Sequence, residues 1–147
     1  MEYLNGKTWD EITREERFFC AELFYELKKN PKPFLDICKL NSNQKYEIGF
    51  EVCFYCDILK AYEMENNEYF SPKRTFDLVL FSDEKIHIFE AKSHQGFKNE
   101  QLKDIIKDPD EIRKLFEKIN EEKKLMLKIP DLKIWAIISS NYEPSVL

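Results

Sequence analysis

Three charged residues lie within the two apolar runs of the stretch FDLVLFSDEKIHIFEAK (76–92), outside its polar turn SDEK (82–85). Asp77, Glu90 and Lys92 stand there among Phe, Leu, Val and Ile, where burying a charge without a partner costs free energy. Two carboxylates brought close together would attract a divalent cation, because Mg²⁺ selects carboxylate oxygens as ligands. The stretch therefore predicts a metal site held by two acids, with a lysine beside it.

The same stretch predicts a β-hairpin that places the two acids face to face. Side chains alternate between the faces of a strand, and a polar turn centred on SDEK (82–85) sets Val79 opposite Ile88. This register also sets Asp77 opposite Glu90, with Cβ atoms about 5 Å apart. A slip of one residue would set mismatched faces against each other, so the hydrophobic pattern favours this register.

Lys92 lies on the same predicted face as Glu90, about 7 Å further along the strand. It would relieve part of the repulsion between the two carboxylates, and a divalent cation would relieve more of it. The alternative is that Glu90 and Lys92 form an exposed ion pair at a strand end, which contributes little stability. The predicted placement of Asp77 opposite Glu90 favours the metal site.

Helices must surround this hairpin, because its strands are apolar on both faces and need cover on both sides. Asp108 is predicted as the N-cap of the last helix, with Pro109 at the first helical position. This order of elements predicts an α/β fold, a three-layer sandwich whose central mixed β-sheet is flanked by helices. Apolar spacing and turn residues predict helices over about 13–29, 46–62, 99–107 and 109–128, a short strand near 69–70 and a strand over 132–140.

The length of 147 residues suits a single domain (1–147), with an N-terminal helical extension (1–45) before a core (46–140). Hydrophobic residues make up 43% of the chain, and no run approaches the ~20 apolar residues of a membrane helix. The first residues, MEYLNGKTWDEITREE, contain neither an apolar signal region nor a cationic start. We therefore expect a cytoplasmic protein with no membrane contact.

The formal net charge of −5 counts against a general nucleic-acid binder, which usually carries a basic excess, but it leaves room for a local basic groove. Cys53 and Cys56 form a CxxC motif, yet the helical apolar spacing around them favours core thiols over a zinc site. His87, expected opposite Leu80 on the other face of the hairpin, is interpreted as a core histidine. The chain contains no Walker or dinucleotide-binding glycine pattern.

Asp77, followed a dozen residues later by Glu90-Ala91-Lys92 on the next strand, resembles the PD-(D/E)xK nuclease superfamily. The resemblance extends over 46–140 and implies a restriction-endonuclease-like fold, with a core of a helix, three strands, a helix and a strand. The motif departs from the family at Phe76, which replaces the proline. Gln101 is similar to the RecB-like branch, but that branch has a tyrosine where this chain has Ile105.

The resemblance implies a role for each site residue. Asp77 and Glu90, with the Ala91 carbonyl beside them, would bind Mg²⁺ or Mn²⁺, and Lys92 would assist the attacking water. In the family a glutamate of the preceding helix often joins the site, and 46–62 offers Glu47 and Glu51. Glu51 is preferred because Phe50 and Val52 flank it, and the alternative is a charge at the rim of a helix.

Polar and basic residues gather at the same predicted end of the hairpin. They are interpreted as contacts to nucleic-acid phosphates, because Lys and Arg make most backbone contacts, with ordinary polar loop composition as the alternative. These residues are Lys73, Arg74, His94, Gln95, Lys98 and Gln101.

The resulting hypothesis is a metal-dependent phosphodiester hydrolase, an endonuclease that acts on DNA or RNA, with DNA the favoured partner. At this size it would act as a homodimer or inside a larger protein assembly. One alternative is a catalytically silent binding or regulatory module that keeps the nuclease-like fold and works through a protein partner. Another is a metal-free structural domain in which the three charges form a surface ion pair. The sequence leaves the choice between DNA and RNA, and any sequence specificity, open.

Overall fold

The computed structural model describes residues 2–8, 16–65, 74–92 and 98–138. These residues form a four-stranded mixed β-sheet with the strand order β1-β2-β3-β4. The first three strands are antiparallel neighbours, and the fourth runs parallel to the third. The strands are β1 (Glu47–Val52), β2 (Phe76–Phe81), β3 (Lys85–Lys92) and β4 (Asp131–Ile138).

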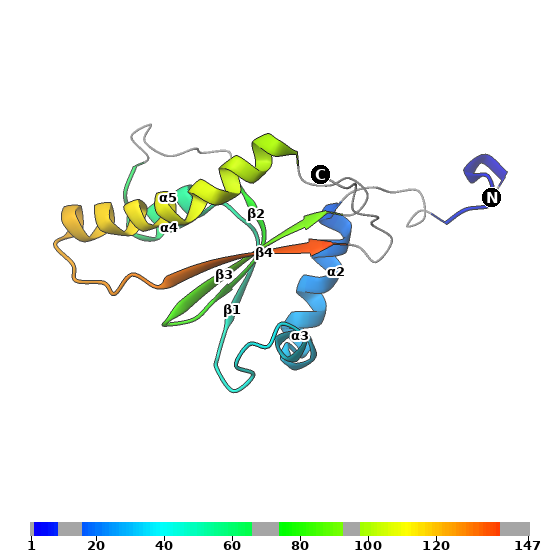
Figure 1. Ribbon diagram of the computed structural model, residues 1–147, viewed down its shortest axis with the longest axis horizontal. Coiled ribbons are helices and arrows are strands. Elements are labelled where there is room, and N and C mark those ends of the chain that lie inside the picture. The colour runs from blue at the N-terminus through cyan, green and yellow to red at the C-terminus, as the bar shows by residue number, and fades with distance from the viewer. Residues whose placement is uncertain (1, 9–15, 66–73, 93–97, 139–147) are drawn as a thin grey trace.

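Helices cover both faces of this sheet (Figure 1). On one face lie α2 (Glu16–Lys29) and α3 (Lys32–Ile37), and on the other lie α4 (Phe54–Ala61) and α5 (Asn99–Lys123). A short 3₁₀ helix, η1 (Glu2–Leu4), precedes them. Each face has its own buried apolar cluster, one around Leu78 and Phe89 and the other around Val79 and Ile88. The predicted α/β fold, with a mixed sheet between helical layers, is confirmed at this level.

The hairpin forms in the predicted register, with Val79 opposite Ile88 and Leu80 opposite His87. His87 is a core histidine, as predicted, with 3% of its surface exposed. Its Nδ1 accepts a hydrogen bond of 3.1 Å from Nε1 of Trp135 on β4. Alternation along β3 therefore points Ile86, Ile88 and Glu90 toward one helical layer and His87 toward the other.

The helix predicted over 46–62 is wrong in its first half, which is strand β1, and α4 begins only at Phe54. Ile48 and Val52 fit both periods, because a spacing of four residues returns to the same face of a strand and of a helix. Pairing with β2 decides in favour of the strand. Gly49 suits this pairing because the Phe81 ring of β2 lies close to its Cα. A Cβ at that position would lie 3.1 Å from the Phe81 ring on β2.

The two helices predicted on either side of residue 108 are a single helix, α5, which continues through Pro109 and ends at Lys123. Asp108 is therefore not an N-cap. The missing N–H of Pro109 removes one helical hydrogen bond, while three apolar side chains of α5 are fully buried against the sheet, Ile112, Leu115 and Ile119. Tertiary burial thus outweighs the local stop signal.

The remaining predicted elements agree in part with the structure. The first helix ends at Lys29 before NPKP, as predicted, and the chain then forms the short α3, which the sequence did not indicate. The last strand spans Asp131–Ile138. Positions 13–15, the predicted strand near 69–70 and positions 139–140 lie outside the described residues.

Candidate functional site

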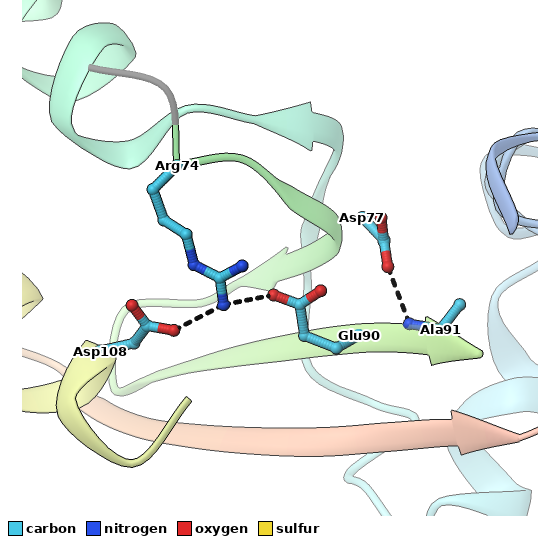
Figure 2. Close-up of polar contacts among 5 residues, drawn as sticks. All are labelled: Arg74, Asp77, Glu90, Ala91 and Asp108. Carbon is cyan, nitrogen blue, oxygen red and sulfur yellow. Dashed lines mark hydrogen bonds and ion pairs between the residues drawn. The ribbon is translucent and has the colours of Figure 1, made fainter. Parts of the chain in front are cut away.

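The sheet brings Asp77 and Glu90 together at one end of the hairpin. Asp77 is close enough to Glu90 to raise the pKa of the Glu90 carboxyl. Asp77 Oδ2 accepts the backbone N–H of Ala91 at 2.8 Å, which holds the aspartate against β3 (Figure 2). The two acids that the sequence singled out therefore occupy one site, on the face of the sheet that α4 and α5 cover.

A third carboxylate joins them from β1. Phe50 pairs with Leu78 and Val52 pairs with Phe76, and Glu51 and Asp77 are the residues between these two pairs on the neighbouring strands. Glu51, Asp77 and Glu90 thus follow one another across three neighbouring strands, and we call them the carboxylate row. The expectation that Glu51 lies on a helix is wrong, because the residue belongs to a strand.

The structure separates the two glutamates that the sequence left as alternatives. Glu47 lies four residues before Glu51, about 13 Å away along β1. It pairs with Phe81, and its carboxylate lies 3.6 Å from Nζ of Lys45 in an exposed ion pair. Only Glu51 therefore lies between the pairs that flank Asp77.

Glu90 is held in an environment that disfavours its charge. The residue is 8% exposed, and burial raises the pKa of its carboxyl to about 8. Arg74 opposes this rise, while the neighbouring Asp77 adds to it. A positive charge placed between the two acids would favour their ionised forms.

Arg74 supplies part of that positive charge. Its Nη2 lies 2.9 Å from Glu90 Oε1 and 2.7 Å from Asp108 Oδ2, so the guanidinium bridges β3 and α5 (Figure 2). The guanidinium also lies over the ring of Phe76, 4.8 Å from its centroid. Asp108 and Glu90 are both buried, and Arg74 is the cation that pairs with each of them.

Sequence reasoning missed Asp108 as part of this site. The DPDE motif indicated a helix N-cap, whereas the residue lies inside α5 with 5% of its surface exposed. No local pattern links position 108 with position 74, because their contact depends on how α5 packs on the sheet. One signal was available in the sequence. Asp108 lies one helical turn before the apolar Ile112, and an acid at such a buried position needs a partner.

Lys92 follows Glu90 on the same face of β3, and the backbone at this position pairs with Ile138 of β4. The residue is half-buried. Lys92 lies two residues beyond the buried Glu90, so strand alternation places both side chains on one face, as predicted. The structure thus gathers all four predicted catalytic residues at one end of the sheet.

The proposed phosphate contacts are brought together only in part. Arg74 lies inside the site, bound to two carboxylates. Lys98 and Gln101 are exposed at the start of α5, where Gln101 Oε1 accepts the Lys98 N–H at 3.2 Å. Lys73, His94 and Gln95 lie outside the described residues.

A cavity of about 270 Å³ adjoins the site where α4 and α5 face each other. Arg74 and Asp108 line it, together with Asp104, Glu111 and Lys107. Three carboxylates and two cations give this wall a net negative charge. The cavity therefore suits a cationic group better than a bare phosphate.

The donor atoms of the carboxylate row fit a hard divalent cation. They are oxygens only, which is the ligand type that Mg²⁺ and Mn²⁺ favour. Within the described residues, no group of three or more His, Cys, Asp and Glu side chains is arranged to hold a metal ion. The resemblance implies that Asp77 and Glu90, with the Ala91 carbonyl, would supply the protein ligands.

The CxxC cysteines lie at the junction of β1 and α4. They would offer sulfur ligands, which differ in type from the oxygen donors of the carboxylate row. Cys53 and Cys56 are thiols and are not joined in a disulfide. Burial and the neighbouring Cys56 raise the pKa of Cys53 to about 11, so the thiolate that would bind a soft metal is disfavoured.

None of the helices in the described segments is both long enough and apolar enough to span a bilayer. No protein-family model matched this sequence, and searches of curated proteins and of solved structures also returned no match.

Proposed function

We propose that this protein is a metal-dependent phosphodiester hydrolase, a nuclease of the PD-(D/E)xK type with a restriction-endonuclease-like fold. The observation that carries the proposal is the carboxylate row, Glu51, Asp77 and Glu90, followed by Lys92 on the same face of β3. Two neighbouring acids can hold a cation, and a nearby lysine can stabilise a developing negative charge.

The order of elements supports this proposal. A helical layer (α2 and α3) precedes three antiparallel strands, and a long helix (α5) then leads to a parallel fourth strand. This is the order of helix, three strands, helix and strand that the resemblance implies, with the short α4 inserted between β1 and β2. Asp77 and Glu90 lie on the central strands β2 and β3, where the resemblance assigns them.

Each residue of the site has a chemical task in this proposal. Asp77, Glu90 and the Ala91 carbonyl would hold Mg²⁺ or Mn²⁺, which when bound lowers the pKa of water and neutralises charge on a phosphodiester. Lys92 would position the attacking water or stabilise negative charge on the phosphorus oxygens. Glu51, on the strand next to Asp77, would complete the negative field that attracts the cation.

The acidic character of the chain bears on how a nucleic acid would bind. With a net charge of −5, the protein offers little general attraction to phosphates. Exposed Lys98 at the start of α5 is one available phosphate contact. Recognition of DNA, the favoured substrate, would then depend on the bound cation and on further surface from a second copy or a larger assembly.

Cleavage of nucleic acid tests the proposal directly. Purified protein is incubated with single- and double-stranded DNA and RNA in the presence of Mg²⁺, Mn²⁺ or EDTA. We expect metal-dependent cleavage by the wild type and a loss of at least about 100-fold in Asp77→Asn and Lys92→Met, which is the scale of one catalytic group.

Two matched variants serve as controls. Asp83→Asn removes an exposed acid from the turn of the same hairpin, and Lys60→Met removes an exposed lysine from α4. Both should cleave like the wild type. Cleavage that persists in Asp77→Asn, or that EDTA does not stop, would contradict the proposed mechanism.

A second candidate function is a binding or regulatory module that keeps this fold without turnover. One observation favours it: Arg74 already neutralises part of the charge of Glu90 and Asp108. Calorimetry with Mn²⁺ separates the candidates, because the nuclease requires metal binding that weakens in Asp77→Asn and not in Asp83→Asn. A folded wild type that binds no Mn²⁺ would favour the silent module.

A further inference from the structure

A second polar cavity, of about 270 Å³, lies on the opposite face of the sheet. It is open to solvent on one side and is lined by the segment between α3 and β1 and by residues from the hairpin turn and β3. His87 lines it, and alternation along β3 places that residue on the face away from Glu90. The cavity is therefore separate from the carboxylate row, and what it binds does not depend on the proposed nuclease activity.

His87 offers this cavity a hydrogen-bond donor. Its Nδ1 accepts the Trp135 indole N–H, so in the neutral ring Nε2 carries the proton. Burial and the nearby Lys133 and Lys85 lower the pKa of this histidine, which keeps the ring neutral. Within the described part of the chain, Nε2 has no hydrogen-bond partner although the residue is 3% exposed.

Two amide side chains in the wall also keep their donors available. Gln44 Oε1 accepts the hydroxyl of Tyr46 at 3.4 Å, and Asn41 Oδ1 accepts the backbone N–H of Asn43 at 3.0 Å. Because their oxygens are engaged, the amide nitrogens of Asn41 and Gln44 remain as donors. Burial raises the pKa of Tyr46, so its phenol keeps the proton that orients Gln44.

Lysines complete the set. Lys39 and Lys85 line the cavity, against a single carboxylate, Glu84. The wall thus combines two ammonium groups, two amide nitrogens and an imidazole N–H, all of which donate hydrogen bonds. A set of donors with a positive balance is the arrangement that binds oxyanions, through charge-assisted hydrogen bonds.

The volume limits the size of the ligand. Pockets for drug-sized ligands measure about 300–1,000 Å³, so this cavity suits a smaller occupant. We propose that the cavity lined by Lys39, Asn41, Gln44, Lys85 and His87 is a binding site for a small phosphate-type oxyanion, either free phosphate or the phosphate group of a nucleotide.

Trp135 provides the signal that tests this proposal. The chain has two tryptophans, so Trp9→Phe leaves the Trp135 indole N–H as the single indole resonance. Inorganic phosphate is titrated into this protein at constant ionic strength, maintained with NaCl. We expect a saturable shift of the indole signal, because a ligand on Nε2 of His87 changes the hydrogen bond on Nδ1.

The variants replace Lys85 and Lys60, which are both exposed, so neither substitution changes the packing of the core. Lys85→Gln should raise the Kd for phosphate about tenfold, the scale of one hydrogen bond to a charged group. Lys60→Gln, an exposed lysine on α4, should leave the Kd unchanged.

A nucleoside monophosphate and its nucleoside distinguish the two sources of phosphate. If the monophosphate binds more tightly than phosphate, the proposed site exists and its occupant is a nucleotide. If phosphate binds more tightly, the proposed site exists and its occupant is the free ion. A shift that follows ionic strength alone, or that Lys85→Gln and Lys60→Gln change equally, would overturn the proposal.

Discussion

Glu90 is the residue whose environment departs furthest from that of an ordinary surface acid. Its pKa rises to about 8 because the carboxyl is buried beside Asp77, and Arg74 offsets this only in part. The unfolded chain releases this proton near the ordinary value of 4.5, whereas the folded protein keeps it. The unfolded state thus binds fewer protons, and the free energy of unfolding falls as pH rises between those values.

We therefore predict that Glu90→Gln removes this loss of stability. Urea unfolding between pH 5 and pH 9 should show a smaller decline in the free energy of unfolding for Glu90→Gln than for the wild type. The glutamine keeps an oxygen for Arg74, so packing is preserved. Glu121→Gln, an exposed acid on α5, is the control and should retain the wild-type slope. Equal slopes in all three proteins would show that Glu90 titrates normally.

Arg74 is the residue on which two buried acids depend. Its side chain is 28% exposed, while those of Glu90 and Asp108 are 11% and 7% exposed. Removing Arg74 leaves the buried carboxylates of Glu90 and Asp108 without their shared cation. Breaking a buried ion pair in this way lowers the free energy of unfolding by about 3 kcal/mol. We expect Arg74→Met to lower the free energy of unfolding at pH 8 by about that amount, with a smaller loss at pH 5.

The matched control is Arg113→Met, which breaks an exposed pair with Asp110 at 3.5 Å. Exposed pairs contribute about 0–1 kcal/mol, so chemical denaturation should barely distinguish this variant from the wild type. If Arg74→Met were as stable as Arg113→Met, the bridge between β3 and α5 would have no role in stability.

At the scale of elements, strand β1 carries a local strain at Glu51. The residue has a φ of 52°, in the left-handed region that is costly for residues with a Cβ. It also lies on the strand next to Asp77, at the site. Strained backbone is often found at functional sites, where the surrounding structure holds it in place, so this strain agrees with the proposed role of Glu51.

Two substitutions separate the strain from the carboxylate. Glu51→Gly and Glu51→Ala both remove the acid, but only glycine relieves the left-handed backbone. We predict that Glu51→Gly is more stable than Glu51→Ala by about 1 kcal/mol in urea unfolding. Both should lose metal-dependent cleavage if the proposed function holds. Equal stability of the two variants would mean that β1 is relaxed at this position.

Helix α5 shows how one element serves two purposes. Its apolar positions Ile112, Leu115 and Ile119 anchor the helix to the sheet, and Asp108 faces Arg74 one turn before Ile112. Continuity through Pro109 keeps these residues on one rigid element. The burial of Ile112, Leu115 and Ile119 against the sheet therefore fixes the helix in place, and this sets Asp108 beside Arg74.

At the scale of the whole molecule, the sheet joins two separate apolar layers. Leu78 and Val79 are neighbours on β2, yet they belong to clusters on opposite faces. Because the strands share one hydrogen-bonded sheet, damage to either layer should weaken the entire fold. We predict that Leu78→Ala lowers the free energy of unfolding by about 2–5 kcal/mol.

Two probes measure whether that loss is global. Trp135 fluorescence, in a Trp9→Phe background, reports the layer of Leu78, and far-UV circular dichroism reports all helices, including α4 and α5. Both transitions should shift together in Leu78→Ala. Met126→Ala, at a side chain that is 99% exposed, should shift neither. Separate transitions for the two probes would show that the layers unfold independently.

The sequence by itself determined the hairpin and its register. Alternating apolar residues on both strands and a polar turn leave one pairing in which the buried faces match, and that pairing sets Asp77 beside Glu90. The α/β class followed from the same strands, because apolar residues on both faces require helices on both sides. These conclusions rest on local periodicity, which residues close in sequence specify.

Only the tertiary structure decided that 46–62 begins as a strand and that Asp108 pairs with Arg74. Ile48 and Val52 match a helix and a strand equally well, and their hydrogen bonds to β2 make the choice. The partner of Asp108 lies 34 positions earlier in the chain. No short-range pattern encodes such a contact, because it depends on how a helix and a sheet meet when each buries its apolar face.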